Sequence, residues 1–572
     1  MLLPALLLVA HSGLAGATDT TPNGAVYNGR ARELDVRVPR VEAGIETDGR
    51  LDEPAWRAAA ILTGFSQFSP ADGRPAQDST EVLVWYSATA IHFGIRAHEA
   101  HGIVNATLAD RDRLGAEDRI EILLGTFDDG RQAYVFGVNP LGVQMDGTLN
   151  ETGALRAGGF SDGGAQSREE PDLSPDFVFT SKGRLTETGY EIEVEIPFKS
   201  LRYQSAGTQS WGLNVVRRVQ HSGHEDTWAP AARASASFLG QSGKLVGLSD
   251  LRRGLVLDVV PEISQRIDGE RTPTSAFDRR TGDIQVGGNV RWGITSNLTL
   301  NGTVRPDFSQ VEADAGQFTF DPRQALFYSE KRPFFLEASE LFATPSNLVY
   351  TRRIVQPVAA AKLTGKVSGT SIAFLSAVDD RSGSLEAGAS HPVFNILRVQ
   401  RDLGRQSRLG ATYTDRIDGD GFNRVASLDG RVVLGDIYSA RFQVAGALDR
   451  ANDVDLDGSL WNLRLDRNGR NFGASYVVSG IDPDFRTRSG FIGRPGIANA
   501  RLVHRYAWYA PPGALWQSVT PDVTLDGTWQ YRTFTRRGDM QDKKLHLNVN
   551  SVLHGGWGLG VSYLVESFGF DP

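Results

Sequence analysis

The chain contains no cysteine and only three methionines in 572 residues. The lack of cysteine excludes disulfide bonds, thiolate zinc or iron–sulfur sites and cysteine nucleophiles. After residue 17, no apolar run reaches the roughly 18 uncharged residues that a membrane-spanning helix needs. An excess of positive charge is also lacking, because 60 Lys and Arg face 68 Asp and Glu. We therefore expect no nucleic-acid partner.

Glycine, aromatic side chains and short alternating segments are abundant instead. The chain has 63 glycines, 9% aromatic residues and 40% hydrophobic residues. This apolar content is too high for an intrinsically disordered protein. Glycine-rich turns between aromatic and β-branched segments favour strands over helices. We predict an all-β fold, and the length indicates more than one domain.

The first 17 residues have the pattern of an export signal. Leu2–Ala10 is an apolar segment, and Ala15-Gly16-Ala17 is a small-residue cleavage site. We expect a signal peptide at 1–17 and a linker at 18–38. Since no spanning helix is predicted, the exported chain is either soluble or enters a membrane as strands.

Short strands dominate residues 39–250. The clearest is Tyr190–Ile196, in which four apolar residues alternate with three glutamates. Such alternation predicts a strand with one buried face and one solvated face. Their spacing along the chain favours an antiparallel β-sandwich. The other strands are expected at Glu81–Tyr86, Ile91–Ala97, Arg119–Gly125, Ala133–Asn139, Phe177–Ser181 and Trp211–Arg218.

Four motifs in this region resemble carbohydrate-binding module family 9. Asp48–Trp56 is similar to the opening of those domains, and Asp118–Leu124 to one of their strands. Gly189–Phe198 and Trp211–Asn214 are similar to two later strands of the family. The motifs follow the family order over about 200 residues. The resemblance implies a β-sandwich at 39–250.

The sugar clamp implied by the resemblance is not matched. Family members hold a sugar between two Trp rings, but Arg113–Glu117 has no aromatic residue and Ser235–Gly247 has only Phe238. We predict weak or absent sugar binding by the sandwich. A charged loop remains as a ligand-site candidate, although a solvated, ion-paired turn is favoured. The candidate residues are Asp112, Arg113, Glu117 and Asp118, with Trp85 and Trp228 as alternative platforms.

Longer alternating strands fill residues 251–572. In 283–294, for example, Ile284, Val286 and Trp292 share a face opposite Asn289 and Arg291. A soluble sandwich or propeller and a transmembrane barrel both give this pattern. Strands of about 10 residues, aromatics near strand ends and charges on one face favour the barrel. We predict a large antiparallel outer-membrane β-barrel with lipid as its partner.

Three runs in this half resemble a bacterial outer-membrane family of unknown function. They are PDFSQVEAD at 306–314, EKRPFFLE at 330–337 and YTRRI at 350–354. In that family a sandwich similar to family 9 is fused to a barrel. The resemblance implies the Gram-negative outer membrane and its assembly machinery as a partner, but no established activity.

The segment 306–353 is too long and too charged for a turn. We predict an ion-paired network in the lumen or at its mouth, with phenylalanines as an apolar anchor. A structural plug and a substrate-contacting segment remain equal alternatives. The network residues are Glu312, Asp314, Glu330, Lys331, Arg332, Glu337, Arg352 and Arg353.

No motif supports a cofactor, a metal or catalysis. Asp453–Gly458 matches the first half of a calcium loop, but its twelfth position is Arg464 rather than Glu, so a hairpin turn is expected. His221 and His224 have loop spacing, which makes a metal site there improbable. No nucleophile elbow, zinc-protease helix or phosphate loop is present.

The leading hypothesis is a barrel with an attached sandwich that binds or takes up an extracellular ligand such as a glycan. The alternative is an exported carbohydrate-active protein, a glycoside hydrolase or its accessory module, in carbohydrate catabolism. We also expect the chain to be truncated at its C-terminus, because Trp557–Val565 runs into a segment ending in Pro572. Pairing of that strand with one near Leu255–Ile263 is the alternative.

Overall fold

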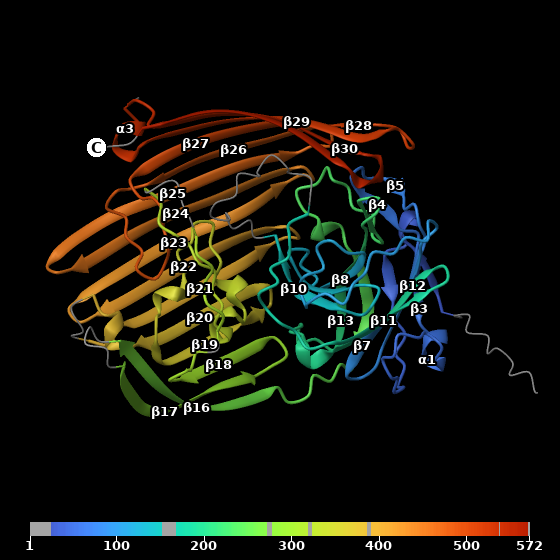
Figure 1. Cartoon of the computed structure of the whole chain (residues 1–572), viewed down its shortest axis with the longest axis horizontal. Helices are drawn as coiled ribbons and strands as arrows, with labels where there is room; N and C mark the ends of the chain where they lie inside the picture. The colour runs from blue at the N-terminus through green and yellow to red at the C-terminus, as the bar shows by residue number, and fades with distance from the viewer. Residues whose placement is uncertain are drawn as a thin grey trace, which may run out of the picture.

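The computed structural model describes residues 24–151, 168–271, 277–309, 311–317, 323–385, 390–536 and 538–569. The predicted signal peptide lies outside these residues. Figure 1 shows two β-rich parts side by side, a compact N-terminal part and a broad curved sheet. No helix in the described ranges is long and apolar enough to cross a membrane. The predicted all-β fold is confirmed.

Two facing sheets form the N-terminal sandwich. The first sheet has the order β1 (Val26–Asn28), β3 (Ala60–Thr63), β6 (Thr80–Tyr86), β7 (Ala90–His98), β12 (Gly189–Pro197) and β11 (Thr180–Thr186). The second has the order β10 (Gln144–Asn150), β9 (Gln132–Val138), β8 (Arg119–Gly125), β13 (Thr208–Val219), β14 (His224–Thr227), β4 (Ser66–Ser69) and β5 (Arg74–Pro75), with β15 (Gly243–Ser249) on β13 and β2 (Asp35–Arg37) on β15. Short helices join them: η1 (Gly29–Ala31), α1 (Pro54–Arg57), η2 (Phe198–Ser200) and η3 (Leu239–Gln241).

The sandwich core comes from the inward faces of both sheets. On β12, Tyr190, Ile192, Val194 and Ile196 are all buried in one cluster, as their alternation predicts. The opposite face differs from the prediction. Glu193 is buried rather than solvated, because residues 48–56 cover it and its carboxylate accepts the backbone N–H groups of Asp48 and Gly49.

The sandwich begins earlier than the sequence suggests. Residues 18–38 were expected to be a linker, but β1 pairs with β3 and β2 pairs with β15, both in parallel. Val36 on β2 is buried in the main core. The predicted boundary at residue 39 is therefore too late. These short strands escaped prediction because three residues carry no readable periodicity.

A sheet of 16 strands, counted within the described residues, forms the C-terminal part. Every neighbouring pair is antiparallel, and no pairing between β16 and β31 occurs in the parts of the chain described. In chain order the strands are β16 (Leu257–Arg271), β17 (Phe277–Gly293), β18 (Leu298–Val304), β19 (Pro357–Val367), β20 (Thr370–Asp379), β21 (Val393–Leu403), β22 (Ser407–Asp418), β23 (Gly421–Leu434), β24 (Tyr438–Ala451), β25 (Val454–Asn468), β26 (Phe472–Ile481), β27 (Ile497–Tyr506), β28 (Trp508–Tyr509), β29 (Trp516–Gln530), β30 (Asp542–Leu553) and β31 (Gly558–Phe568). The helical turns are α2 (Pro333–Leu336), η4 (Ser339–Phe342), η5 (Thr351–Arg353), η6 (Arg381–Gly383), α3 (Tyr531–Phe534) and η7 (His554–Gly556).

The two faces of this sheet have opposite character. The apolar residues predicted to share a face are exposed, among them Ile284, Val286, Leu448 and Val561. The residues between them point to the inner face, which is covered by other parts of the chain. Polar side chains are buried there, including Asn301, Lys362, Arg398, Asp429, Gln443 and Asn462. The outer face is thus apolar, and the inner face is polar except where apolar residues such as Leu375, Phe394 and Ile396 pack against the phenylalanines of the β18–β19 connection.

The sandwich packs against the end of the sheet where the connections are short. Tyr203 donates its backbone N–H to the carbonyl of Ser296 in the β17–β18 turn, at 3.2 Å. Ala236 donates likewise to Asp436 in the β23–β24 turn, at 2.6 Å. Arg470 in the β25–β26 turn pairs with Asp72 of the sandwich at 3.3 Å. In Figure 1 the sandwich accordingly lies against the right-hand ends of the strands.

The longer connections lie at the opposite end, and the longest of them folds back onto the inner face. Residues 305–356 join β18 to β19 and contain α2, η4 and η5. Ser346 donates its N–H to Oε1 of Gln443 on β24 at 2.6 Å, and Tyr350 donates to the carbonyl of Ser489. From the other side, Arg202 and Gln132 of the sandwich contact Glu340 in η4. The segment therefore bridges the inner sheet face and the sandwich.

Candidate functional site

The acidic side chains of the charged loop at 112–118 are held by hydrogen bonds within the sandwich. Asp118 is buried and accepts the backbone N–H groups of Asn105 and Gln220. Glu117 accepts from the side chains of Thr107 and Asn139. Asp112 accepts the backbone N–H of Asp146 at 2.9 Å. Arg113 has 78% of its side chain exposed and lies 4.0 Å from Asp110, which is also exposed. Glu117 and Asp118 are thus buried and hydrogen-bonded to neutral groups, whereas the sequence favoured a solvated, ion-paired turn.

Neither candidate tryptophan platform can face a ligand. Trp85 and Trp228 are both 0% exposed. Trp85 packs edge-on against Trp56 and stacks on His92, with ring centroids 3.9 Å apart. Trp228 belongs to the main sandwich core. The interpretation of either ring as a sugar platform is corrected accordingly, because burial of an indole ring removes the face on which a sugar stacks.

The predicted network in the 306–353 segment forms as a set of local pairs. Arg352 makes a two-pronged contact with Asp314, at 2.6 and 2.8 Å. Lys331 lies 3.7 Å from Glu312 and 3.9 Å from Asp314. Arg353 stands apart from these pairs and donates instead to the carbonyl of Gly490.

Arg332 is the centre of the segment. Its guanidinium pairs with Glu330 at 2.7 Å and donates to the carbonyls of Thr351 and Ile354. It also lies over the rings of Phe308 and Phe335, at 5.1 and 4.3 Å from their centroids. This arrangement ties the three predicted motif runs to one another.

Glu337 connects the segment to the sheet. It accepts from Arg291 on β17 at 2.9 Å and from Asn301 on β18 at 2.6 Å. The buried ammonium of Lys362 on β19 donates to the backbone carbonyls of Phe334 and Glu337. The segment is therefore anchored to three consecutive strands.

A cavity of about 730 Å³ lies between this segment and strands β16–β18. Phe308 and Phe334 supply apolar walls, and Ser174 of the sandwich reaches its edge. Six acidic residues line it against two basic ones, Arg291 and Lys331. Sequence analysis singled out Glu312, Glu330 and Glu337 as network residues. It missed Asp258 and Glu262 on β16, and also Asp307, which follows β18 within the first motif run.

Buried ion pairs join the sandwich to the large sheet, and sequence reasoning missed them. Lys366 on β19 contacts both Asp129 of the sandwich and Asp402. Arg131 of the sandwich pairs with the same Asp402 at 2.9 Å. Glu151 lies 3.4 Å from Arg431 on β23. We call these residues the junction pairs.

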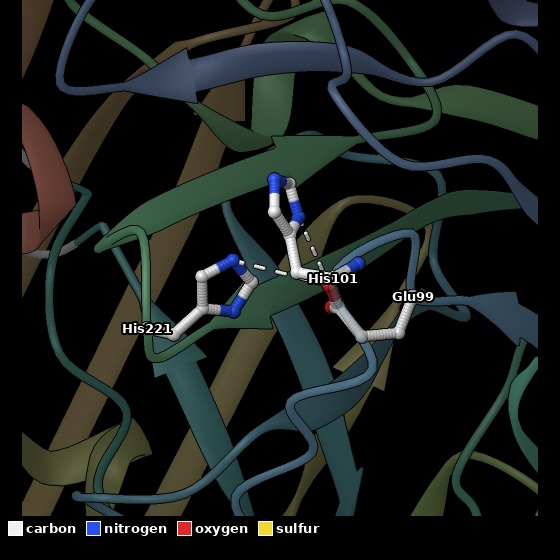
Figure 2. Close-up of side chains that lie close together, drawn as sticks. All are labelled: Glu99, His101 and His221. Atoms are coloured by element: carbon white, nitrogen blue, oxygen red, sulfur yellow. Dashed lines mark hydrogen bonds and ion pairs between the residues drawn. The ribbon is translucent and has the colours of Figure 1, made fainter.

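Three groups of side chains in the described residues bring metal-ligand atoms within 4.8 Å of one another. The first group consists of Asp112, Asp146 and Asp176, and the guanidinium of Arg111 already lies among these carboxylates. Burial raises the pKa of Asp146 in this group to about 6. A second consists of Asp48, Glu53 and Glu193. The third combines Glu99, His101 and His221 (Figure 2). No local sequence pattern links these two histidines, because 120 residues separate them.

The comparisons with known proteins fall on both parts of the chain. Residues 257–371 match a family described as "Domain of unknown function (DUF5916)". The DUF5916 match runs from β16 into β20 and includes the 306–353 segment. No curated protein matches the sequence.

Solved structures of two kinds are similar to the chain. A family 9 carbohydrate-binding module from Caldicellulosiruptor kristjanssonii, in complex with cellotriose, has 14% identity and a TM-score of 0.25, covering 37% of this chain and 95% of that one. OccK11 (OpdR) of Pseudomonas aeruginosa has 12% identity and a TM-score of 0.27, covering 64% and 86%. OccAB1 of Acinetobacter baumannii has 9% identity and a TM-score of 0.27, covering 79% and 91%.

Proposed function

We propose that the chain is an outer-membrane β-barrel protein that binds a small polar ligand on its inner face, for uptake and without catalysis. The observation that carries this proposal is the two-faced sheet. Its outer face exposes apolar side chains strand after strand, while its inner face buries charged and amide side chains. A soluble sheet of this size would hide its apolar face, whereas lipid makes that face favourable.

The position of the sandwich supports a periplasmic side for it. In outer-membrane barrels, short turns face the periplasm and long loops face outward. The sandwich contacts the short turns at Ser296, Asp436 and Arg470. The junction pairs then act as a clamp that holds the sandwich over the periplasmic opening.

The ligand site that fits this proposal is the 730 Å³ cavity. Its volume is typical of small-molecule sites. Carboxylates accept hydrogen bonds from hydroxyl and ammonium groups, and aromatic walls pack on apolar ligand faces. The excess of acids over bases repels anions. A neutral or cationic polyhydroxylated compound, such as a short glycan, is the ligand class we propose.

Fractionation tests the membrane part of the proposal. The full-length protein should sediment with membranes and require detergent for extraction. Recovery of the folded chain in the soluble fraction after ultracentrifugation without detergent would overturn the barrel assignment.

The absence of cysteine makes orientation directly measurable. A single cysteine replaces Arg113 on the sandwich or Asp420 in the β22–β23 turn, both exposed. On intact cells a membrane-impermeant maleimide should label D420C but not R113C. R113C should react once the outer membrane is permeabilised. The unsubstituted chain, which cannot react, is the control.

Labelling of R113C on intact cells would contradict the periplasmic placement. If D420C then stayed unlabelled, the chain would be inserted the other way round. If both reacted, the sandwich would lie outside the cell.

A further inference from the structure

A histidine pair and a buried carboxylate meet at one edge of the sandwich, away from the cavity. Glu99 follows β7, His101 lies two residues later, and His221 lies in the turn between β13 and β14. Figure 2 shows both imidazole rings directed at the carboxylate of Glu99. Nδ1 of His101 is 3.4 Å from Oε1 of Glu99, and Nε2 of His221 is 3.9 Å from the same oxygen.

These distances match a tetrahedral zinc site with one open position. Zinc binds imidazole nitrogen and carboxylate oxygen at about 2.0–2.2 Å, which places two tetrahedral ligands about 3.4 Å apart. The Glu99–His101 pair already has this spacing, and all three ligand atoms lie within 4.8 Å. Nε2 of His221, at 3.9 Å from Oε1, must come slightly closer, and its side chain is 17% exposed.

A second observation is the state of the carboxylate. The Glu99 side chain is only 1% exposed, and Oε2 has no hydrogen-bond partner. Its nearest full positive charge is Arg217, 3.5 Å from Oε2. The guanidinium of Arg217 is committed elsewhere, to the carbonyls of Ser79 and His98 and the hydroxyl of Thr80. A buried carboxylate normally needs stronger compensation than this.

The backbone holds the ligands in place. Glu99 donates its N–H to the carbonyl of Thr188, and Oε1 accepts the N–H of His101 at 3.2 Å. The turn that carries His221 is closed by a bond from Gly223 to the carbonyl of Gln220. Gln220 in turn donates its N–H to Asp118. The predicted site residue Asp118 thus supports the turn from behind.

We propose that Glu99, His101 and His221 bind one Zn²⁺ ion through Oε1, Nδ1 and Nε2, with water in the fourth position. Two imidazoles favour zinc over Ca²⁺ and Mg²⁺, which prefer oxygen ligands. Oε2 faces the guanidinium of Arg217 at 3.5 Å, while Oε1 is the oxygen that lies near both imidazoles and would bind the metal.

The site lies where the sandwich meets the β30–β31 turn. At Gly223, two residues after His221, an added Cβ would lie 2.9 Å from Cα of Gly556 in that turn, so the two backbones approach each other closely. Bound zinc would stiffen the β13–β14 turn and thereby this contact. The proposal concerns a structural metal and is independent of the ligand cavity.

Zinc titration of the full chain in detergent tests the proposal. The protein is purified through a tag without histidine, stripped with chelator, and titrated with Zn²⁺ against a chromophoric competitor. One equivalent should bind. H101A changes a half-exposed position that tolerates substitution. It should weaken zinc binding by at least about 100-fold, because loss of a residue that only supports a ligand costs up to about that much.

The matched control is H546A. His546 lies on β30 and hydrogen-bonds to Ser562 and Asn548. This variant should bind zinc as the unsubstituted chain does. Substitution with Co²⁺ should give the visible absorption of tetrahedral coordination, and that signal should be lost in H101A and H221A.

The proposal fails if no equivalent of zinc binds, or if H101A and H221A bind it as tightly as the unsubstituted chain. It also fails if Ca²⁺ or Mg²⁺ competes at equal concentration. H546A losing zinc together with the site variants would place the metal elsewhere and overturn the assignment. None of these outcomes affects the membrane or cavity experiments.

Discussion

Glu193 shows how one buried acid links local structure to pH. Its burial, reinforced by the neighbouring Glu53 and Asp48, raises the pKa of its carboxyl from 4.5 to about 7. The folded chain therefore holds a proton that the unfolded chain releases between these values. The free energy of unfolding should fall as the pH rises from about 4.5 to about 7 and then level off.

Glu193→Gln should remove this contribution. The amide oxygen still accepts the N–H groups of Asp48 and Gly49, but the charged form is no longer possible. The variant should match the unsubstituted chain near pH 4.5 and be more stable at pH 8, as measured by denaturation in detergent with tryptophan fluorescence. E195Q, two residues along β12, should keep the original pH dependence. A steeper fall in E193Q would contradict the assignment.

The same residue marks what alternation can and cannot predict. The pattern of β12 identified Tyr190, Ile192 and Val194 as core, because a strand's period fixes which residues share a face. The same pattern predicted a solvated face for Glu193, and this was wrong. The residues that cover Glu193, 48–56, lie nearly 140 positions earlier in the chain, so the strand's own period carries no sign of them. The histidine pair escaped for the same reason. Contacts between distant segments leave no trace in a local period.

At the level of single strands, the exposed apolar face of the large sheet gives a direct test of the proposed membrane insertion. Leu463 lies in the middle of β25 on the outer face and is 39% exposed. Leu463→Lys should cost about 2–4 kcal/mol of folding free energy in lipid, as a charge near the bilayer midplane does. Refolding titrations into vesicles measure it.

The matched control for that variant is Leu185→Lys. Leu185 lies on β11 of the sandwich and is 54% exposed. A lysine there meets water and should change stability by less than about 0.5 kcal/mol. Equal effects at the two positions would show that the outer face of the sheet meets water, not lipid.

The junction pairs predict how strongly the two parts hold each other. Lys366→Met leaves the buried Asp129 without its paired cation, while Asp402 keeps Arg131, and this should cost about 3–5 kcal/mol. Limited proteolysis should then release the sandwich from the sheet more readily.

Arg450→Met is the control for the junction variant. Arg450 pairs with Asp455 across a hairpin, with 49% and 65% of the two side chains exposed. Loss of such a surface pair should cost less than about 1 kcal/mol. If the two variants were equally stable, the junction pairs would not be the clamp.

Strand positions in the large sheet were predictable because its two faces have opposite surroundings, so apolar and polar residues alternate along each strand. The hairpin at Asn452 and Asp453 was also predictable. Both residues have positive φ, as a tight turn between β24 and β25 requires, so the calcium-like motif is a turn. The junction pairs were not predictable, since Lys366 and Asp129 are 237 positions apart.

For the whole molecule, the two parts make different predictions about sugars. The sandwich has both candidate rings, Trp85 and Trp228, buried. In calorimetry of the full chain, any micromolar binding of glucose or cellotriose should therefore be lost in Glu337→Gln. Binding that persists in E337Q would place a sugar site on the sandwich after all. A W85A variant would be misleading, because it would disrupt the core.

The contact at Glu340 has a consequence for communication across the membrane. Its carboxylate is held by Arg202 and Gln132 of the sandwich, and Glu337, three residues earlier, lines the ligand cavity. A ligand that displaces Glu337 therefore also moves η4, and this movement reaches the sandwich through Glu340. In the proposed orientation, a ligand bound in the barrel thereby shifts the periplasmic sandwich before the ligand has crossed the membrane.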